Sequence, residues 1–321
     1  VAPSFVRLGN FEIHAAMGET QALRQLVDHC MQEHWPELEG DIIGWYADVC
    51  RRTAALMARW MVLGFVHGVM NTDNLSVLGL SIDYGPFGWL EPFEPDWTPN
   101  TTDAQGRRYA YGRQPQIAQW NLGCFGAALL PLGCERDALE GALRSYHAAY
   151  NTHFRAGMAA RLGLASLEEE DLPWLQDWLG LLQLLKADYS LSFRRLADCQ
   201  SPAALLEMLD STRYRQEGLS EAETSRALSW FAAWQQRLEA AAEDGAQVRA
   251  RMQAANPAVV PRNWMLAQAI EAAEAGDGGP LEQLMQALRQ PFQEPEEVSW
   301  MERRPDWAAH KPGCSMLSCS S

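Results

Sequence analysis

Two acids and an asparagine flank a short apolar run, and side chains of these kinds bind metals and move protons. The stretch 67–88 reads HGVMNTDNLSVLGLSIDYGPFG, in which Asp73 and Asn74 precede the run and Asp83 follows it. If residues 78–79 form a two-residue turn, Asn74 and Asp83 stand directly opposite each other in a hairpin. Directly opposed side chains have Cβ atoms roughly 4.5 to 5.5 Å apart, so both can reach one ion.

An amide oxygen and a carboxylate at that separation suit a single hard cation. In this register Leu75 pairs with Ile82, and Asn74 and Asp83 form the next pair. Mg²⁺ takes oxygen ligands, keeps several waters and completes its shell with substrate phosphates. Asp73 is adjacent to the amide ligand and could accept the proton of a hydroxyl group within hydrogen-bond reach. The sequence therefore predicts a site for a metal and a nucleotide, with Asn74 and Asp83 as metal ligands and Asp73 as the base.

Simpler interpretations of the same residues stay open on spacing alone. Asn74 and Asp83 are also typical of polar positions beside a turn, and Asp73 is typical of a helix or loop cap. His67 is expected to be structural, holding the loop by a hydrogen bond, since a neutral imidazole is a common buried group.

Helical patterns surround the motif and must position it. Apolar residues recur at helical spacing over 23–31 and 45–63, which predicts two helices with one buried face each. Proline and glycine then cluster over 84–106. A loop of that length inside a compact domain is usually functional.

The second half of the chain is predicted to be helical as well. One apolar stripe covers 175–185, with Pro173 in its first turn. Ser220 and Glu223 form a capping-box pattern before a further helix. Another helix is expected from about 263 to 275.

Composition narrows the class of protein. The chain has 321 residues and a formal net charge of −15, which argues against an extended surface that binds nucleic acid. Its seven cysteines follow no CxxC spacing and indicate reduced thiols of a cytoplasmic protein. No apolar stretch is long enough for a membrane span. The first residues, VAPSFVRLGNFEIHAA, read like the middle of a protein.

The motif resembles that of the selenoprotein O family, also called the YdiU family, a group of protein-kinase-like enzymes. HGVMNTDN followed by DYGPFG carries the resemblance, and VAPSFVRLGNFE, QPQIAQWNL and NPAVVPRNW are similar in the same order. The resemblance implies a mainly α fold, in which a protein-kinase-like C-terminal lobe has a short β-hairpin at the active site and a helical C-terminal extension. The expected units are the lobe core with its catalytic loop over 1–160, the extension over 161–304 and a flexible tail over 305–321.

What the resemblance implies about function is specific. The family transfers AMP from ATP to protein hydroxyl groups, so the expected partners are ATP and proteins with Ser, Thr or Tyr targets, without nucleic acid or membrane. Asp73 resembles the proton acceptor, and Asn74 and Asp83 resemble the ligands of Mg²⁺, with Mn²⁺ as an alternative. Asp83 stands where kinases have the aspartate of D-F-G. Arg7, in SFVRLG, resembles one of two arginines that grip the nucleotide phosphates, so Arg7 and Asp83 form the expected nucleotide site.

The resemblance also leaves alternatives. The second phosphate-gripping arginine, the glycine-containing nucleotide loop and a lysine of the family would precede Val1, so the chain resembles the C-terminal lobe and tail. Protein kinase-type phosphoryl transfer and a catalytically silent helical interaction module therefore remain as other functions. Cys319, followed by two serines, resembles a family ending that implies redox control through a disulfide. The loop after Asp83 has no cysteine, which leaves Cys314 as a local partner.

Overall fold

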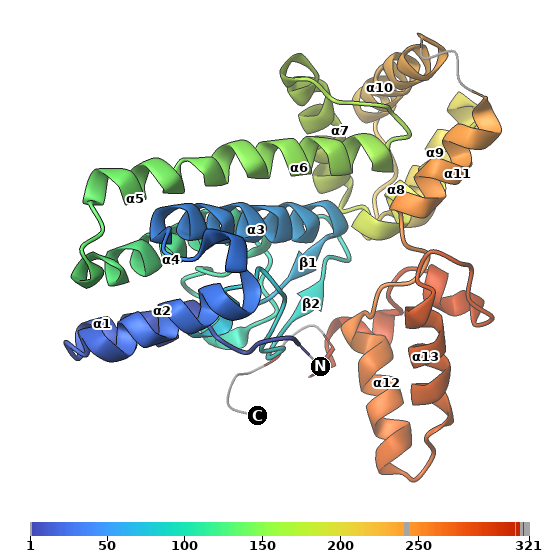
Figure 1. Cartoon of the computed structure of the whole chain (residues 1–321). Coiled ribbons are helices and arrows are strands. Elements are labelled where there is room, and N and C mark those ends of the chain that lie inside the picture. The colour runs from blue at the N-terminus through green and yellow to red at the C-terminus, as the bar shows by residue number, and fades with distance from the viewer. Residues whose placement is uncertain (1, 241–243, 312, 315–316, 318–321) are drawn as a thin grey trace.

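The computed structural model describes residues 2–240, 244–311, 313–314 and 317. Within them the chain is mainly helical, with one two-stranded sheet (Figure 1). The α-helices are α1 (Leu8–Ala16), α2 (Thr20–His34), α3 (Ile42–Leu63), α4 (Gln114–Ala128), α5 (Arg136–Leu143), α6 (Ser145–Arg161), α7 (Leu172–Leu185), α8 (Tyr189–Leu196), α9 (Pro202–Thr212), α10 (Glu221–Ala240), α11 (Gly245–Ala255), α12 (Asn263–Glu274) and α13 (Gly279–Arg289). Short 3₁₀ turns cover Pro36–Leu38, Thr72–Asn74, Thr101–Asp103, Tyr111–Arg113, Leu130–Leu132, Glu169–Asp171, Val298–Met301 and Asp306–Ala309.

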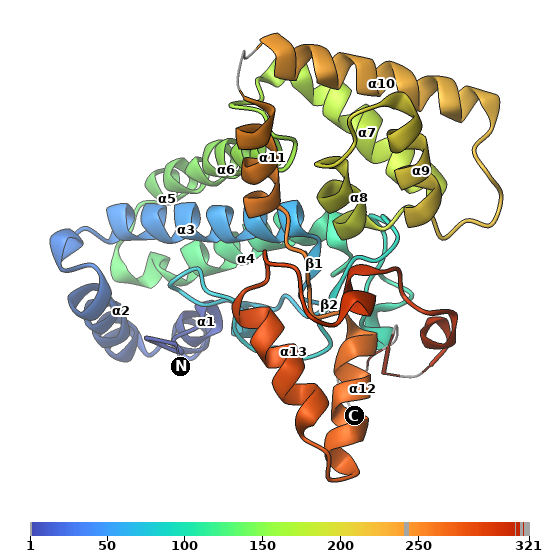
Figure 2. The same ribbon diagram turned by 90° about the vertical axis from the view of Figure 1, so that its right-hand side faces the viewer.

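Helix α3 is the centre of the first half of the chain. Asp41 caps its start by accepting a hydrogen bond from the backbone N–H of Gly44 at 2.8 Å. Its apolar side buries Trp45 and Trp60, as the helical pattern predicted. Helix α6 runs along α3 in both views (Figures 1 and 2). Together with α1, α2, α4 and α5 these helices enclose what we call the first core, where Trp45 and Phe125 meet edge to face at 5.5 Å.

A second core lies among α7 to α11. Trp178 of α7 and Trp230 of α10 stack there with ring centroids 4.2 Å apart. The predicted Pro173 is in the first turn of α7. The predicted capping box before α10 is also confirmed: the backbone N–H of Ser220 donates to Glu223 at 2.8 Å, and that of Glu223 donates back to the Ser220 hydroxyl.

Helices α12 and α13 form an antiparallel pair that projects from the rest of the molecule (Figures 1 and 2). They pack on a small third core, which includes Trp264, Leu284 and Cys314. A buried ion pair connects this unit to the second core, because Arg262, just before α12, binds both oxygens of Asp188, the residue that caps α8.

The segment predicted as a tail, 305–321, has several packed residues among those that the structure describes. Ala308 and Cys314 are buried in the third core. The backbone of Leu317 exchanges hydrogen bonds with Pro99 and Thr101 at 2.9 and 2.8 Å. Cys319 lies outside the described residues, so its predicted pairing stays a prediction.

Strands β1 (Phe65–Val66) and β2 (Gly88–Trp89) pair antiparallel and close the loop that contains the motif. The two side chains of β1 point to opposite sides, Phe65 into the first core and Val66 into the second. The loop of residues 67–87 is therefore held at the junction of the two larger cores.

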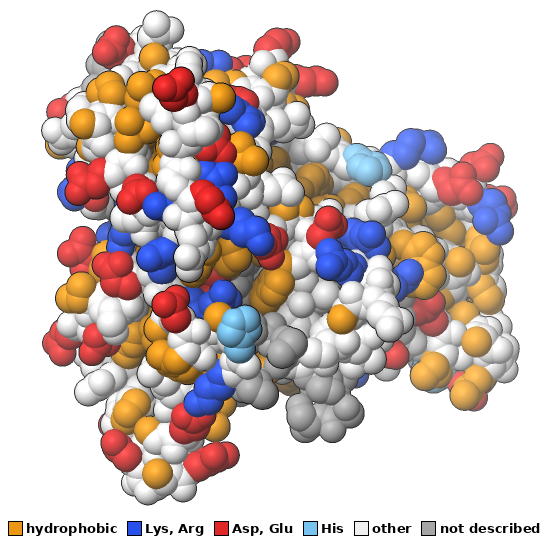
Figure 3. Space-filling view, turned by 180° about the vertical axis from the view of Figure 1, so that it is seen from behind, with side chains coloured by type: hydrophobic (Ala, Val, Ile, Leu, Met, Phe, Trp, Pro, Cys, Tyr) orange, Lys and Arg blue, Asp and Glu red, His pale blue; other side chains and the backbone are white. Residues whose placement is uncertain are grey.

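Charged side chains of both signs are interspersed over the face seen from behind (Figure 3). Among the described residues, none of the helices combines the length and the apolar character that crossing a membrane requires.

Candidate active site

The predicted hairpin is wrong in register and extent. Leu75 bridges to Ser81, not to Ile82, and this is a single antiparallel bridge with no continuing ladder. A turn from Ser76 to Gly79 closes it, with the Gly79 N–H donating to the Ser76 carbonyl at 3.1 Å and Gly79 at φ +67°. Asn74 and Asp83 are therefore not an opposed hairpin pair. Their assignment as ligands of one metal rests on their chemistry and on the resemblance.

Arg7 lies beside the loop because the chain pairs there with a distant segment. The Leu8 N–H donates to the Leu75 carbonyl at 3.0 Å, and the Val77 N–H donates to the Val6 carbonyl at 3.1 Å. Arg7 thereby forms an antiparallel bridge with Ser76. This pairing brings the predicted phosphate-binding cation next to the segment that follows Asn74.

Asp73 lies against the start of α1. Its carboxylate occupies the space over Gly9, where an added Cβ would be 2.0 Å from Oδ1 of Asp73. The side chain is otherwise exposed to solvent. The carboxylate thus lies at the N-terminal end of α1, where the helix dipole interacts favourably with negative charge.

His67 connects the two arms of the loop, and its predicted structural role is confirmed. It is buried, stacks on Trp60 at 5.4 Å, and its Nε2 lies 2.8 Å from the Ile82 carbonyl oxygen, next to Asp83. The backbone N–H of Val69 lies 3.4 Å from its Nδ1, which fits a neutral ring with its proton on Nε2. Burial lowers the pKa of His67, in keeping with that neutral state.

The two predicted metal ligands, Asn74 and Asp83, differ in their hydrogen bonding, exposure and backbone conformation. The Nδ2 of Asn74 donates to the Val69 carbonyl at 2.9 Å, and within the described chain its amide oxygen accepts no hydrogen bond. Asp83 is exposed and has a left-handed backbone with φ +57°, which is uncommon for a residue other than glycine and is often found at functional sites. An amide oxygen and a carboxylate fit Mg²⁺ or Mn²⁺.

The described residues contain no group of three or more His, Cys, Asp or Glu side chains that could hold a metal without further ligands. A divalent ion at Asn74 and Asp83 would therefore need water and substrate phosphates to complete its shell. That is the ordinary coordination of Mg²⁺ in nucleotide sites.

Sequence reasoning missed the buried amides that hold the loop from behind. The Oε1 of Gln114 accepts the His67 N–H at 3.0 Å, and its Nε2 donates to the Phe65 carbonyl at 2.9 Å. Asn121, on the same face of α4, donates to the Met70 carbonyl. The signal was present: two amides seven residues apart interrupt an otherwise apolar helix face, within the stretch QPQIAQWNL.

The loop after Asp83 also reaches back to the motif. Asn100 donates to the Gly68 carbonyl, and the hydroxyl of Tyr109 donates to Oδ1 of Asn71. The loop over 84–106, predicted to be functional, thus contacts the motif, and Tyr109 adds a contact just beyond it.

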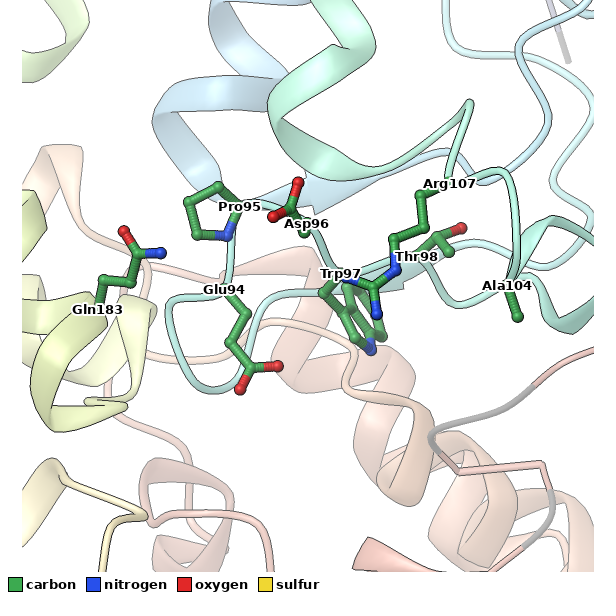
Figure 4. A pocket seen from close by; sticks show the side chains of 8 residues that line it. All are labelled: Glu94, Pro95, Asp96, Trp97, Thr98, Ala104, Arg107 and Gln183. Carbon is green, nitrogen blue, oxygen red and sulfur yellow. The ribbon is translucent and has the colours of Figure 1, made fainter.

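A cavity of about 390 Å³ opens along this loop, lined in part by Glu94, Asp96, Trp97 and Arg107 (Figure 4). None of the predicted site residues lines it. Trp97 in its wall packs over Gly88 of β2, where an added Cβ would lie 2.6 Å from the ring.

Comparison with known proteins agrees with the resemblance seen in the motif. The model of a family described as protein adenylyltransferase SelO matches residues 1–289. A protein nucleotidyltransferase YdiU from Azoarcus sp. (strain BH72) is 46% identical over 330 residues, which cover all of this chain and 63% of that relative. Proteins of the same name from Xanthomonas campestris pv. campestris (strain B100) and Rhodopirellula baltica are 46% and 43% identical, again over all of this chain and over 63% and 64% of theirs. The chain thus spans less than two thirds of the length of these relatives, and it belongs to the SelO family.

Proposed function

We propose that this chain carries the catalytic loop of a Mg²⁺-dependent protein adenylyltransferase with a protein-kinase-like fold. The enzyme transfers AMP from ATP to Ser, Thr or Tyr hydroxyl groups of proteins. The observation that supports this best is the pairing of residues 6–8 with residues 75–77, which puts Arg7 next to the segment of Asp73 and Asn74. A phosphate-binding cation, a base and a metal ligand are the minimum set for transfer from a nucleotide.

Each side chain has one task in the proposed reaction. Arg7 binds nucleotide phosphate, for which the planar guanidinium is well shaped. Asp73 accepts the proton of the attacking hydroxyl group. The hydroxyl oxygen forms a bond to the α-phosphorus, the bond from that phosphorus to the bridging oxygen breaks, and pyrophosphate leaves with the electron pair. Asn74 and Asp83 would hold the divalent ion, which supplies neutralisation of the phosphate charge when bound.

The test uses ATP labelled in the α or the γ phosphate, with this chain and with any longer product of its gene. Retention of the α label on protein, and not of the γ label, is the expected result. Retention of the γ label would establish phosphoryl transfer instead. A calorimetric titration with Mg·ATP that gives no heat and no thermal stabilisation would favour the catalytically silent helical module.

Variants assign the roles within the same assay. Asp83→Ala and Asp73→Ala should each lower AMP transfer by about 100-fold or more. The first removes a metal ligand and its electrostatic stabilisation, and the second removes the proton acceptor. Chelation of divalent ions should abolish transfer in the unaltered protein. Asp137→Ala, which removes an exposed carboxylate on α5, is the control and should keep the original rate. Full activity of Asp83→Ala would contradict the metal assignment.

A further inference from the structure

Three successive backbone carbonyls of the catalytic loop each accept a hydrogen bond from a different asparagine side chain. The carbonyl oxygens of residues 68, 69 and 70 lie 3.2, 2.9 and 2.8 Å from the Nδ2 atoms of Asn100, Asn74 and Asn121, in that order. This part of the loop has no helix or strand. The three amides therefore replace the hydrogen bonds that regular structure would otherwise supply.

The two outer donors are buried and come from separate parts of the chain. Asn121 is completely buried on α4, and Asn100 is 4% exposed in the loop after Asp83. Asn100 is itself fixed, because its Oδ1 accepts the Thr102 N–H at 3.0 Å. The carbonyls on either side of Val69 are thus held by buried side chains from two separate later segments, the loop after Asp83 and α4.

The side chain of Asn121 has a buried polar atom that destabilises the fold. Its Oδ1 is buried and accepts no hydrogen bond from the described residues. A buried acceptor without a donor destabilises a protein, and an apolar side chain on this face of α4 would avoid that loss. Among the described residues, the Asn121 side chain makes one hydrogen bond, which its amide N–H donates to the Met70 carbonyl, so that bond is what the side chain contributes.

We propose that Asn100 and Asn121 are positioning residues that orient the amide oxygen of Asn74 toward the proposed metal site. They fix the carbonyls of Gly68 and Met70, and between these stands the Val69 carbonyl that holds the Asn74 amide nitrogen. With that nitrogen held, the amide oxygen of Asn74 is turned away from Val69 and available to a cation. The proposal rests on the proposed role of Asn74 in the active site, and it adds two residues that contact neither metal nor nucleotide.

The experiment compares Asn121→Asp with Asn256→Asp. Both replacements keep the shape of the side chain and remove the N–H donors. Asn256 is a matched control, because it is also completely buried and its Nδ2 also donates to backbone carbonyls, those of Arg161 and Met252 at 2.9 Å, in another part of the molecule. If Asn121→Asp does not fold, Asn100→Asp replaces it.

The first readout is amide hydrogen exchange of peptides covering 65–75 in the chain without metal or nucleotide. Exchange there should be at least several-fold faster in Asn121→Asp than in the unaltered chain, and unchanged in Asn256→Asp. The second readout is the Mn²⁺ concentration that gives half-maximal AMP transfer. It should rise about tenfold in Asn121→Asp, the scale usual for residues that orient metal ligands, and excess Mn²⁺ should restore much of the rate.

The two readouts separate this inference from the proposed function. Faster exchange in Asn121→Asp without AMP transfer in any form of the protein would support the positioning of the loop and contradict the enzyme activity. Unchanged exchange over 65–75, or a Mn²⁺ requirement that moves equally in both variants, would overturn the inference.

Discussion

At the scale of single residues, the carboxylate of Asp73 leaves no room for a side chain on Gly9. A Cβ on Gly9 would lie 2.0 Å from Oδ1 of Asp73, so Gly9→Ala must displace the carboxylate or the first turn of α1. A displacement of about 1 Å can lower a catalysed rate roughly 100-fold, so we expect AMP transfer to fall by that order. The melting temperature should change little, since the carboxylate can turn into solvent.

Gly123→Ala is the control for this prediction. Gly123 lies inside α4, and outside this helix no atom lies within 4 Å of an added Cβ. Alanine is the better helix former by about 1 kcal/mol, so this variant should be as active as the original and at least as stable. If Gly9→Ala keeps the full rate, the position of Asp73 does not matter to the reaction, and its assignment as the base is contradicted.

Residues of the candidate site could be predicted from the sequence where their own side chains suggest a chemical role. Asp73, Asn74 and Asp83 carry groups that bind metals or accept protons, and they stand together in one short motif. Asn100 and Asn121 act through backbone carbonyls of another segment, and no feature of their own type shows which carbonyl they meet. Only the interruption of an apolar helix face by an amide indicated that Asn121 was special.

At the scale of elements, local signals predicted helices well and failed for the hairpin. The apolar periods that predicted α2, α3 and α7, and the caps of α7 and α10, depend on neighbours within one or two turns. The hairpin register depends on what else pairs with its first strand. Residues 6–8 occupy one edge of 75–77, and on the other side Leu75 bridges to Ser81. A partner so far away in sequence leaves no local pattern.

The ion pair of Arg262 and Asp188 gives a prediction about the contact between α8 and α12. Their side chains are 2% and 0% exposed and meet in a two-bond arrangement. Arg262→Ala should lower the free energy of unfolding by about 3 to 5 kcal/mol, because it leaves a buried carboxylate without its partner. Urea unfolding followed by circular dichroism measures the change.

Arg249→Ala is the matched control for that pair. Arg249 and Asp198 are 47% and 55% exposed, so losing this ion pair should change the free energy of unfolding by less than about 1 kcal/mol. Equal effects of the two replacements would show that the buried pair contributes no more than a surface pair.

At the scale of the whole molecule, the three cores differ in size and in how they are connected. The first and second cores meet along α3 and β1, which contribute buried residues to each, and the partly buried Tyr150 packs against both. The third core is small, and the contact of Arg262 with Asp188 links it to the second. Cores joined mainly through polar contacts can open separately from the rest of a protein.

Cysteines in all three cores allow a test of whether the third core opens separately from the other two. Cys30 and Cys50 lie in the first core and Cys199 in the second, and burial raises the pKa of each thiol to about 12. Burial also raises the pKa of Cys314 in the third core. Since only the thiolate reacts, all four should resist alkylation near pH 8 while their own core is folded.

Brief alkylation along a urea gradient, read by mass spectrometry, should therefore modify Cys314 at a lower urea concentration than Cys30, Cys50 and Cys199. The reason is that the third core has the fewest buried apolar residues of the three and so loses the least hydrophobic free energy when it opens. Arg262→Ala should lower the urea midpoint of Cys314 more than that of Cys30. If all four thiols react at one midpoint in both proteins, helices α12 and α13 unfold with the rest of the chain, and the ion pair sets the stability of one cooperative unit.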